Sequence, residues 1–425
     1  MLPLRIYVFS IIAQLNYEIK HIFLFTKRDN RDKINTLSFQ EITVKKILDA
    51  VKDYFRRSDM LLLLLCIIAT VYGIVLIDSA TRYFGEGSYT VIQTLSLFIG
   101  ILLYVLFSII DVEIIADKWR LLFLFDVFFI GSLFIFGEAG DSGNNAWIRF
   151  GSIGIQPAEV VKVPYCILLA KQMEHCRDRR GLNHFYSIAF LAAHFLLMFG
   201  LIIVSSSDLG SALVYAFMFV IMLFAGGVKL YWFAIAIGAV AAVTPILWNH
   251  FLADYQKERI IAPYDPSIDP TGLGITWQAN QSKAAIASGE FFGKGLFQGD
   301  RTQSGSVPQQ QTDFIFAVAG EELGFIGCIA IVILLSVIII RCVMVGLRSN
   351  SRMGMTICFG IAAMLAFQTL ENVGMCLGLT PVIGLTLPFF SYGGSSIITL
   401  FAAMGIVSGI RMHRNPQIFW MGNIS

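Results

Sequence analysis

The chain has 425 residues, of which 56% are hydrophobic and only 14% are charged, and its formal net charge at pH 7 is +2. Soluble globular proteins contain about 45–50% apolar and about 25% charged residues. The composition therefore excludes a disordered protein, a nucleic-acid-binding protein and an ordinary cytosolic enzyme, and it indicates an integral membrane protein.

The N-terminal segment, 1–58, precedes the first strongly apolar run. Within it, residues 3–25 are fairly apolar but carry charged side chains such as Arg5 and Glu18, which is typical of a helix at the membrane interface. This stretch lacks a small-residue cleavage site, so a cleaved signal peptide is not expected. We predict a cytoplasmic or interfacial segment and assign it no function.

Ten runs of mostly apolar residues follow, each close to the length of about 20 residues that an α-helix needs to cross a bilayer. They span residues 60–80, 90–110, 121–137, 157–173, 187–206, 210–227, 230–249, 314–340, 354–379 and 395–411. We therefore expect an all-α integral membrane protein with about ten transmembrane helices in a polytopic domain, 59–414, followed by a short tail, 415–425.

Lysine and arginine concentrate on one side of the predicted spans. Cytoplasmic loops of membrane proteins carry an excess of these residues. If the N-terminus is cytoplasmic, the inner loops hold most of the basic residues and the short outer loops hold only Arg82 and Arg149. We therefore expect both termini in the cytoplasm, and one large extracytoplasmic loop, 249–313.

Glu159 and Lys162 form the first candidate site, near the start of a predicted span. Pro157 suits the first helical turn, and residues three apart share a helix face, so the two charges can neutralise each other. Charged groups in a bilayer are costly and often functional. The pair is either a structural ion pair or the polar wall of an outward-open cavity, where Lys162 meets a phosphate.

Arg149 lies in a short outer loop, two residues after Trp147. Tryptophan is enriched at membrane interfaces. Arg149 therefore either anchors the loop to lipid headgroups or contacts a phosphate at the outer surface.

The long loop contains two Asp-Pro steps, at Asp265 and Asp269, close to Gly272. Such a sequence favours turns that hold a carboxylate in one place, although each aspartate can equally serve a local turn. Residues 277–289 mix amide, hydroxyl and apolar side chains, which suits a re-entrant or interfacial helix beside a polar cavity. A connection this long is usually functional or disordered.

Further polar residues lie inside the predicted spans, among them Asp126, His194, Glu321 and Glu322. Glu321 and Glu322 are adjacent, so they cannot share a helix face. We interpret His194 as a core histidine whose hydrogen bonds are satisfied, because a proton relay would need further polar groups on facing helices.

Several short blocks occur in a fixed order along these spans. They are Gln-Pro-x-Glu-x-x-Lys ending at Lys162, Asp-Pro-x-Gly from Asp269 with Gln281-Ser282 downstream, Thr312-Asp313-Phe314, Gly320-Glu321-Glu322, Asn372-Val373, Leu387-Pro388 and Ser391-Tyr392-Gly393-Gly394. In this order and at these membrane positions, they resemble the SEDS proteins (shape, elongation, division and sporulation), the family of RodA, FtsW and SpoVE. The resemblance covers about residues 55–414.

The resemblance implies a peptidoglycan glycosyltransferase of the bacterial cytoplasmic membrane. Such an enzyme polymerises lipid II, the disaccharide peptide linked to undecaprenyl pyrophosphate, at the outer face, together with a class B penicillin-binding protein that crosslinks the strands. The family's essential aspartate lies in the large outer loop, and Asp269 fits the family pattern better than Asp265. The resemblance does not separate roles in cell shape, cell division and sporulation.

Our mechanistic hypothesis makes Asp269 the general base for the acceptor 4-hydroxyl. An α-linked donor and a β-1,4 product imply inversion. The departing pyrophosphate needs charge stabilisation from Arg149, Lys162, Lys283 or a divalent cation such as Mg or Mn. No cofactor is certain, and the sequence leaves any metal site unknown. The predicted substrate-binding residues are Arg149, Glu159, Lys162, Gln281, Ser282, Lys283, Thr312, Asp313, Asn372, Ser391 and Tyr392.

Two other functions stay open. A lipid II flippase is suggested by the charged Glu159–Lys162 pair within a bundle of many helices. A scaffold that only recruits a penicillin-binding protein would need no charged cavity. The outward-facing Asp-Pro loop favours the enzyme.

Overall fold

The structure is a computed structural model, and it describes residues 48–49, 51–85, 87–138, 144–151, 153–250 and 252–414. The chain divides into two units, Met1–Arg57 and Ser58–Ser425. In the first unit, residues 51–57 are helical, and Arg57 pairs with Asp53 at 3.0 Å. The interfacial segment predicted at residues 3–25 and the predicted tail, 415–425, lie outside the described residues.

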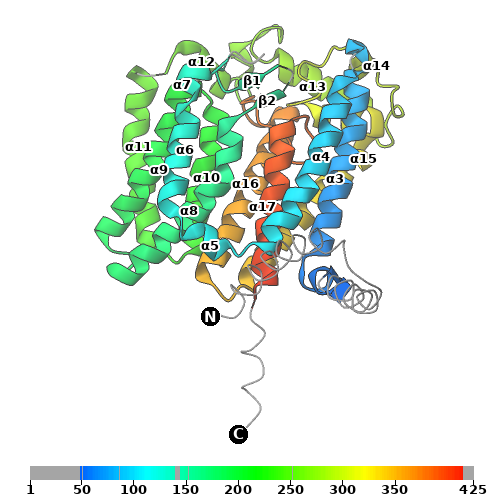
Figure 1. Cartoon of the computed structure of the whole chain (residues 1–425). Coiled ribbons are helices and arrows are strands. Elements are labelled where there is room, and N and C mark those ends of the chain that lie inside the picture. Colours follow the sequence, from blue (N-terminus) through cyan, green and yellow to red (C-terminus); the bar gives the residue numbers. More distant parts are fainter. Residues whose placement is uncertain are drawn as a thin grey trace, which may run out of the picture. The chain divides into compact units, whose positions relative to one another are not determined.

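The second unit is a bundle of long helices (Figure 1). Its helices are α3 (Met60–Thr81), α4 (Ser88–Ile109), α5 (Val112–Ala116), α6 (Trp119–Gly131), α7 (Leu133–Phe136), α8 (Pro157–Arg179), α9 (Phe185–Ser206), α10 (Leu209–Ala225), α11 (Leu230–His250), α12 (Asp254–Ile261), α13 (Trp277–Ser288), α14 (Asp300–Gln303), α15 (Ile315–Leu347), α16 (Arg352–Cys376) and α17 (Gly394–Met412). Two 3₁₀ turns, η1 (Arg82–Phe84) and η2 (Pro266–Ile268), complete the helical elements.

Within the described residues, eight of these stretches are long and apolar enough to cross a membrane, with α6 and α7 counted as one. The shorter apolar helix α10 and the more charged helix α8 bring the number to about ten, as expected from the apolar runs. Nearly all side chains described on α11 are exposed on the bundle, which suits a helix that faces lipid.

A buried carboxylate joins three helices at one end of the bundle. Asp59 caps the N-terminus of α3 and is fully buried. Its oxygens accept hydrogen bonds from Arg341 of α15, at 2.8 Å, and lie 2.9 Å from Arg411 of α17. Since a buried charge is tolerated only when it is paired, this cluster fixes the relative positions of α3, α15 and α17.

The opposite end of the bundle carries α12, α13, α14 and a short β-hairpin (Figure 1); we call it the loop end. The strands β1 (Ile148–Phe150) and β2 (Ile153–Ile155) are antiparallel, with Arg149 opposite Gly154. The apolar runs did not predict this hairpin, because strands of three residues are too short to show a pattern. It adds a small sheet to the helical architecture.

Helix α15 is broken at Gly324, whose φ is 66° and ψ is −161°, although the sequence predicted one continuous span. At the break, the amides of Phe325 and Ile326 donate to the carbonyl oxygens of Glu290 and Phe291, at 3.0 and 3.3 Å. A Cβ at Gly324 would lie 2.3 Å from the amide nitrogen of Gly293. The glycine therefore lets the long connection pack into the break.

The carboxylates of Glu321 and Glu322 hold this connection in place. Glu321 accepts from the amide and hydroxyl of Thr302, both at 2.8 Å. Glu322 accepts from Ser79 at 2.7 Å and from Gln303 at 3.0 Å. As expected for adjacent residues, the two side chains use different partners, and both serve to anchor α14.

Candidate functional site

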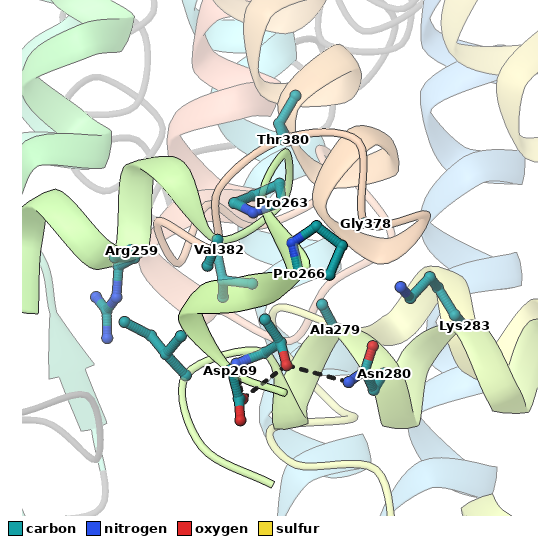
Figure 2. Close-up of a pocket in the computed structure, with 13 residues that line it drawn as sticks. Arg259, Pro263, Pro266, Asp269, Ala279, Asn280, Lys283, Gly378, Thr380 and Val382 are labelled. Carbon is teal, nitrogen blue, oxygen red and sulfur yellow. Dashed lines mark hydrogen bonds between the residues drawn. The ribbon is translucent and has the colours of Figure 1, made fainter. Parts of the chain in front are cut away.

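A pocket with a volume of about 190 Å³ lies at the loop end (Figure 2). One side comes from the connection between α11 and α15, and the other comes from the segment after α16. Its lining residues are Arg259, Ala262, Pro263, Pro266, Asp269, Ile275, Thr276, Ala279, Asn280, Lys283, Gly378, Thr380 and Val382. Figure 2 shows Asp269 between Arg259, at the end of α12, and Lys283, on α13.

Asp269 is held by four hydrogen bonds, and its side chain is partly exposed. Its Oδ2 accepts from the amide of Gly274 at 2.9 Å and from the amide and hydroxyl of Thr276 at 3.1 and 2.8 Å. Its Oδ1 accepts from the hydroxyl of Thr271 at 3.1 Å. These bonds, led by those from Thr276, favour the ionised form and hold the pKa of Asp269 below its ordinary value.

Asp265, at the other Asp-Pro step, has a local role. Its Oδ1 accepts from the amide of Ser267 at 2.9 Å, and it caps η2. Hydrogen bonding to Ser267 lowers the pKa of Asp265. Its side chain is not among those that line the pocket. Asp265 therefore serves only a local turn, which was one of the two roles open to each aspartate from the sequence. Asp269, in contrast, faces the pocket.

Arg259 and Lys283 are exposed cations. Among the described residues, neither forms an ion pair with a carboxylate, and both face the pocket that contains Asp269. Gly378 has a φ of +68°, and a Cβ there would lie 3.0 Å from Cδ of Lys283, so the glycine leaves room for the lysine stem. Two cations beside one carboxylate can hold an anion, such as a phosphate group, next to a proton acceptor.

Arg259, Thr276 and Asn280 were missed from the sequence. Asn280 donates to the carbonyl oxygen of Gly272 at 3.2 Å and to the hydroxyl of Thr276 at 3.1 Å. The spacing of Thr276, Asn280 and Lys283 places them on one face of α13, so this signal was available. Arg259 had no comparable signal, because its position depends on how the connection folds back.

Gln281 and Ser282 also lie on α13, but they do not line the pocket. Gln281 Oε1 accepts from Arg301 at 2.7 Å. Ser282 is fully buried and donates to the carbonyl oxygen of Cys376, at the end of α16, at 2.8 Å. These contacts fix α13 against its neighbours. A direct contact of either side chain with substrate stays a prediction.

The predicted ion pair between Glu159 and Lys162 is present at the start of α8, and both side chains are buried. Next to it, Gln156 donates to Asp208 Oδ2 at 2.9 Å, and Ser211 donates to the same carboxylate. Burial raises the pKa of Asp208, although Ser211 and Lys162 act in the opposite direction. The Lys162 ammonium is thus enclosed by protein in this structure.

Five other predicted residues meet where α15 begins. Asn372 donates to the carbonyl oxygen of Asp313 at 2.7 Å, and Ser391 donates to that of Thr312 at 2.6 Å. The ring of Tyr392 packs edge-on against Tyr89, and it does not line the pocket. Burial, followed by the charge of Asp208, raises the pKa of Asp313 to about 6, although its side chain keeps some solvent exposure.

The predicted residues therefore fall into separate groups. Asp269 and Lys283 line the pocket, whereas Glu159 and Lys162 are buried in the bundle. Arg149 is exposed on β1 and does not line the pocket.

Within the described ranges, the structure has no group of three or more His, Cys, Asp or Glu side chains placed to hold a metal ion. Mg²⁺ often binds through only one or two carboxylates together with substrate phosphates. Asp269 fits such a partial site, so a divalent cation stays a prediction.

The chain is similar to proteins of one family. The FTSW_RODA_SPOVE family, described as cell cycle protein, matches residues 59–416. The peptidoglycan glycosyltransferase MrdB of Escherichia coli K12 is 34% identical over 272 residues, which cover 64% of this chain and 72% of that protein. The probable peptidoglycan glycosyltransferase FtsW of Trichlorobacter lovleyi is 33% identical over 378 residues, covering 86% and 96%.

Solved structures share the fold. One, from a study of how a peptidoglycan synthase complex coordinates polymerization and crosslinking, has a TM-score of 0.72, is 28% identical and covers 84% of this chain and 99% of that chain. The crystal structure of Thermus thermophilus RodA has a TM-score of 0.62, is 26% identical and covers 84% and 97%. With the match over residues 59–416, these likenesses show that this multi-pass membrane protein belongs to the FtsW/RodA/SpoVE family.

Proposed function

We infer that the chain is a peptidoglycan glycosyltransferase that polymerises lipid II at the outer face of the bacterial cytoplasmic membrane. The observation that carries this inference is the pocket in which the Asp269 carboxylate lies between the Arg259 and Lys283 cations. Such a pocket offers both a proton acceptor and countercharge for a phosphorylated leaving group. The family relatives named as peptidoglycan glycosyltransferases support the same activity.

In the proposed reaction, Asp269 takes the proton from the 4-hydroxyl of the acceptor GlcNAc. The oxygen then forms a bond to the anomeric carbon of the donor MurNAc, while the bond from that carbon to the pyrophosphate oxygen breaks. Undecaprenyl pyrophosphate leaves with the bonding electrons, and the configuration inverts. The four hydrogen bonds to Asp269 favour the ionised carboxylate, the form that a general base requires.

Lys283 and Arg259 would stabilise the charge that develops on the departing pyrophosphate. We expect Lys283→Gln to lower kcat/KM for lipid II polymerisation about 10- to 100-fold, because a hydrogen bond to a charged group contributes about 1.5–3 kcal/mol. The measurement is the initial rate of polymer formation by the purified chain. The matched control is Lys257→Gln, which removes an amine paired with Asp254 at 3.3 Å. Equal rates for both variants would remove Lys283 from the proposed site.

The pH profile of kcat/KM reports the base in the free enzyme. Because hydrogen bonds lower the pKa of Asp269, activity should persist below the ordinary aspartate range and fall only as the carboxylate becomes protonated. Thr276→Val removes the bond at 2.8 Å, so the acid limb should move to higher pH. Thr271→Val, which removes the weaker contact at 3.1 Å, should move it less. An unchanged limb in Thr276→Val would rule out Asp269 as the titrating base.

We also propose that both termini are cytoplasmic and that the connection 249–313 is extracytoplasmic, which would place the pocket on the side where lipid II is polymerised. The domain 59–414 would then be the catalytic membrane domain. A class B penicillin-binding protein is the proposed partner, supported by the similar chain from a complex that coordinates polymerization and crosslinking. Roles of Arg149, Glu159 and Asp313 in substrate binding remain part of this proposal.

A lipid II flippase is the second candidate. It is favoured by one observation, the buried charged cluster of Glu159, Lys162 and Asp208 inside the bundle. A flippase would move the lipid II headgroup across the membrane without making polymer, and Asp269 would not be required. A reconstituted assay that follows both products separates the two functions.

A further inference from the structure

Three buried polar side chains lie within the α6–α9 part of the bundle, and the described residues supply no hydrogen bond to them. Asp126 and Tyr165 are fully buried, and His194 is 4% exposed. Both carboxylate oxygens, the phenolic oxygen and both imidazole nitrogens lack a partner among the described residues. The sequence predicted satisfied hydrogen bonds for His194, and no protein group among the described residues supplies them.

The three side chains come from different helices but form one cluster. The ring of Tyr165, on α8, lies 5.3 Å from the ring of His194, on α9. Phe123, on α6, lies 5.7 Å from the same imidazole, and Asp126 follows Phe123 by three residues on the same face. Asp126 is also within electrostatic range of Tyr165. Figure 1 shows α6, α8 and α9 as neighbours.

The cluster lies well inside the membrane domain. Tyr165 comes eight residues after the start of α8. At a rise of about 1.5 Å per residue, it lies about 12 Å along the helix from that end. Groups at such a depth have no access to bulk water along a lipid-facing surface. Buried polar atoms almost always have a protein or water partner, and leaving one without any costs about 1–3 kcal/mol. Five such atoms in one cluster therefore point to a ligand rather than to a dry core.

The chemistry of the cluster selects water as that ligand. A buried water typically makes about three hydrogen bonds to polar groups, and these groups offer donors and acceptors in a small space. An isolated carboxylate charge would be far more costly than a hydrogen-bonded neutral carboxyl. The cluster also mixes a carboxyl, a phenol and an imidazole, all of which can donate and accept protons.

A fourth residue, Tyr215, packs against the cluster. The ring of Tyr215, on α10, lies 4.9 Å from that of Tyr165. Its hydroxyl donates to the carbonyl oxygen of Ala158 at 2.8 Å. Ala158 immediately precedes Glu159, which is paired with Lys162. Tyr215 therefore packs against Tyr165 and also contacts the first turn of α8, where Glu159 and Lys162 lie.

We propose that Asp126, Tyr165 and His194 form an internal site for ordered water that holds one exchangeable proton. The site itself contains three titratable groups: Asp126 on α6, Tyr165 on α8 and His194 on α9. Its titratable neighbours are Cys166 on α8 and Tyr215 on α10. The inference does not depend on the reaction at Asp269.

The test is infrared spectroscopy of the full chain in lipid nanodiscs, in H₂O and in D₂O. We expect a band from a protonated, hydrogen-bonded carboxyl that shifts in D₂O and disappears in Asp126→Asn. Because water links the three groups, the band should also move in His194→Gln and in Tyr165→Phe. The matched control is Tyr104→Phe, a buried tyrosine whose hydroxyl donates to a protein carbonyl, that of Asp59, at 2.7 Å; it should leave the band in place.

A carboxyl band that does not exchange in D₂O would show a dry site and overturn the proposal. A band unaffected by both His194→Gln and Tyr165→Phe would also overturn it, because the groups would then share no water. Should Asp126→Asn not fold, the responses of these two variants still decide the outcome. If the band shifted with sodium concentration and not with pH, the site would bind a metal cation and not a proton. That result would contradict the proposal.

Discussion

Asp269→Asn is expected to lower the rate of lipid II polymerisation by the purified chain about 10²–10⁴-fold, since a positioned general base contributes about that factor. The amide keeps the size of the side chain but cannot take up the hydroxyl proton. The backbone amides of Gly274 and Thr276, which donate to the carboxylate at 2.9 and 3.1 Å, can still donate to the amide oxygen. The measurement is the initial rate of glycan strand formation from purified lipid II.

Asp265→Asn is the matched control for this change. It lies at the other Asp-Pro step of the same connection, but its carboxylate caps η2 through Ser267 at 2.9 Å. We expect a much milder loss, caused only by a weaker turn. Similar losses in the two variants would mean that both act through the folding of the loop, and Asp269 would then have no separate chemical role.

Lys162→Met is expected to destabilise the folded protein by about 3–5 kcal/mol, because it leaves the carboxylate of Glu159 buried without its partner. Glu159 is only 6% exposed and Lys162 is fully buried, so water cannot replace the ammonium easily. The measurement is the thermal or denaturant unfolding of the purified chain in one detergent. The double variant Glu159→Gln/Lys162→Met, which removes both charges, should recover most of the lost stability.

The double variant also separates the two interpretations of this ion pair. If the pair is structural, recovered stability should bring recovered polymerisation. If the pair lines a substrate path, the double variant should be stable but inactive. If Lys162→Met were as stable as the unchanged protein, the buried Glu159 carboxylate would not need the Lys162 ammonium as its partner. That result would contradict the argument from burial.

The sequence predicted the bundle well, because crossing a bilayer imposes long apolar runs on the helices. It did not predict the break in α15, since Gly324 stands in an apolar run and its conformation depends on the connection that packs against it, through Glu290 and Phe291. The hairpin at Arg149 was also missed, because its pairing with Gly154 is a local tertiary feature with no sequence period.

The site was only partly predictable. The Asp-Pro-x-Gly pattern singled out Asp269, and the pocket contains it together with Lys283. Arg259 could not be found from the sequence, because α12 approaches Asp269 only after the connection has folded. Gln281 and Lys283 are two residues apart on α13 and therefore face different directions. A motif alone cannot show that one contacts Arg301 while the other faces the pocket.

The central claim is that this chain forms glycosidic bonds and uses Asp269 to do so. The most direct measurement follows polymer formation and headgroup translocation together in proteoliposomes that contain the full chain and lipid II, with and without a penicillin-binding protein. We predict polymer with the unchanged chain and almost none with Asp269→Asn. Translocation of lipid II without polymer, at the same rate in both proteins, would contradict the account and establish the flippase.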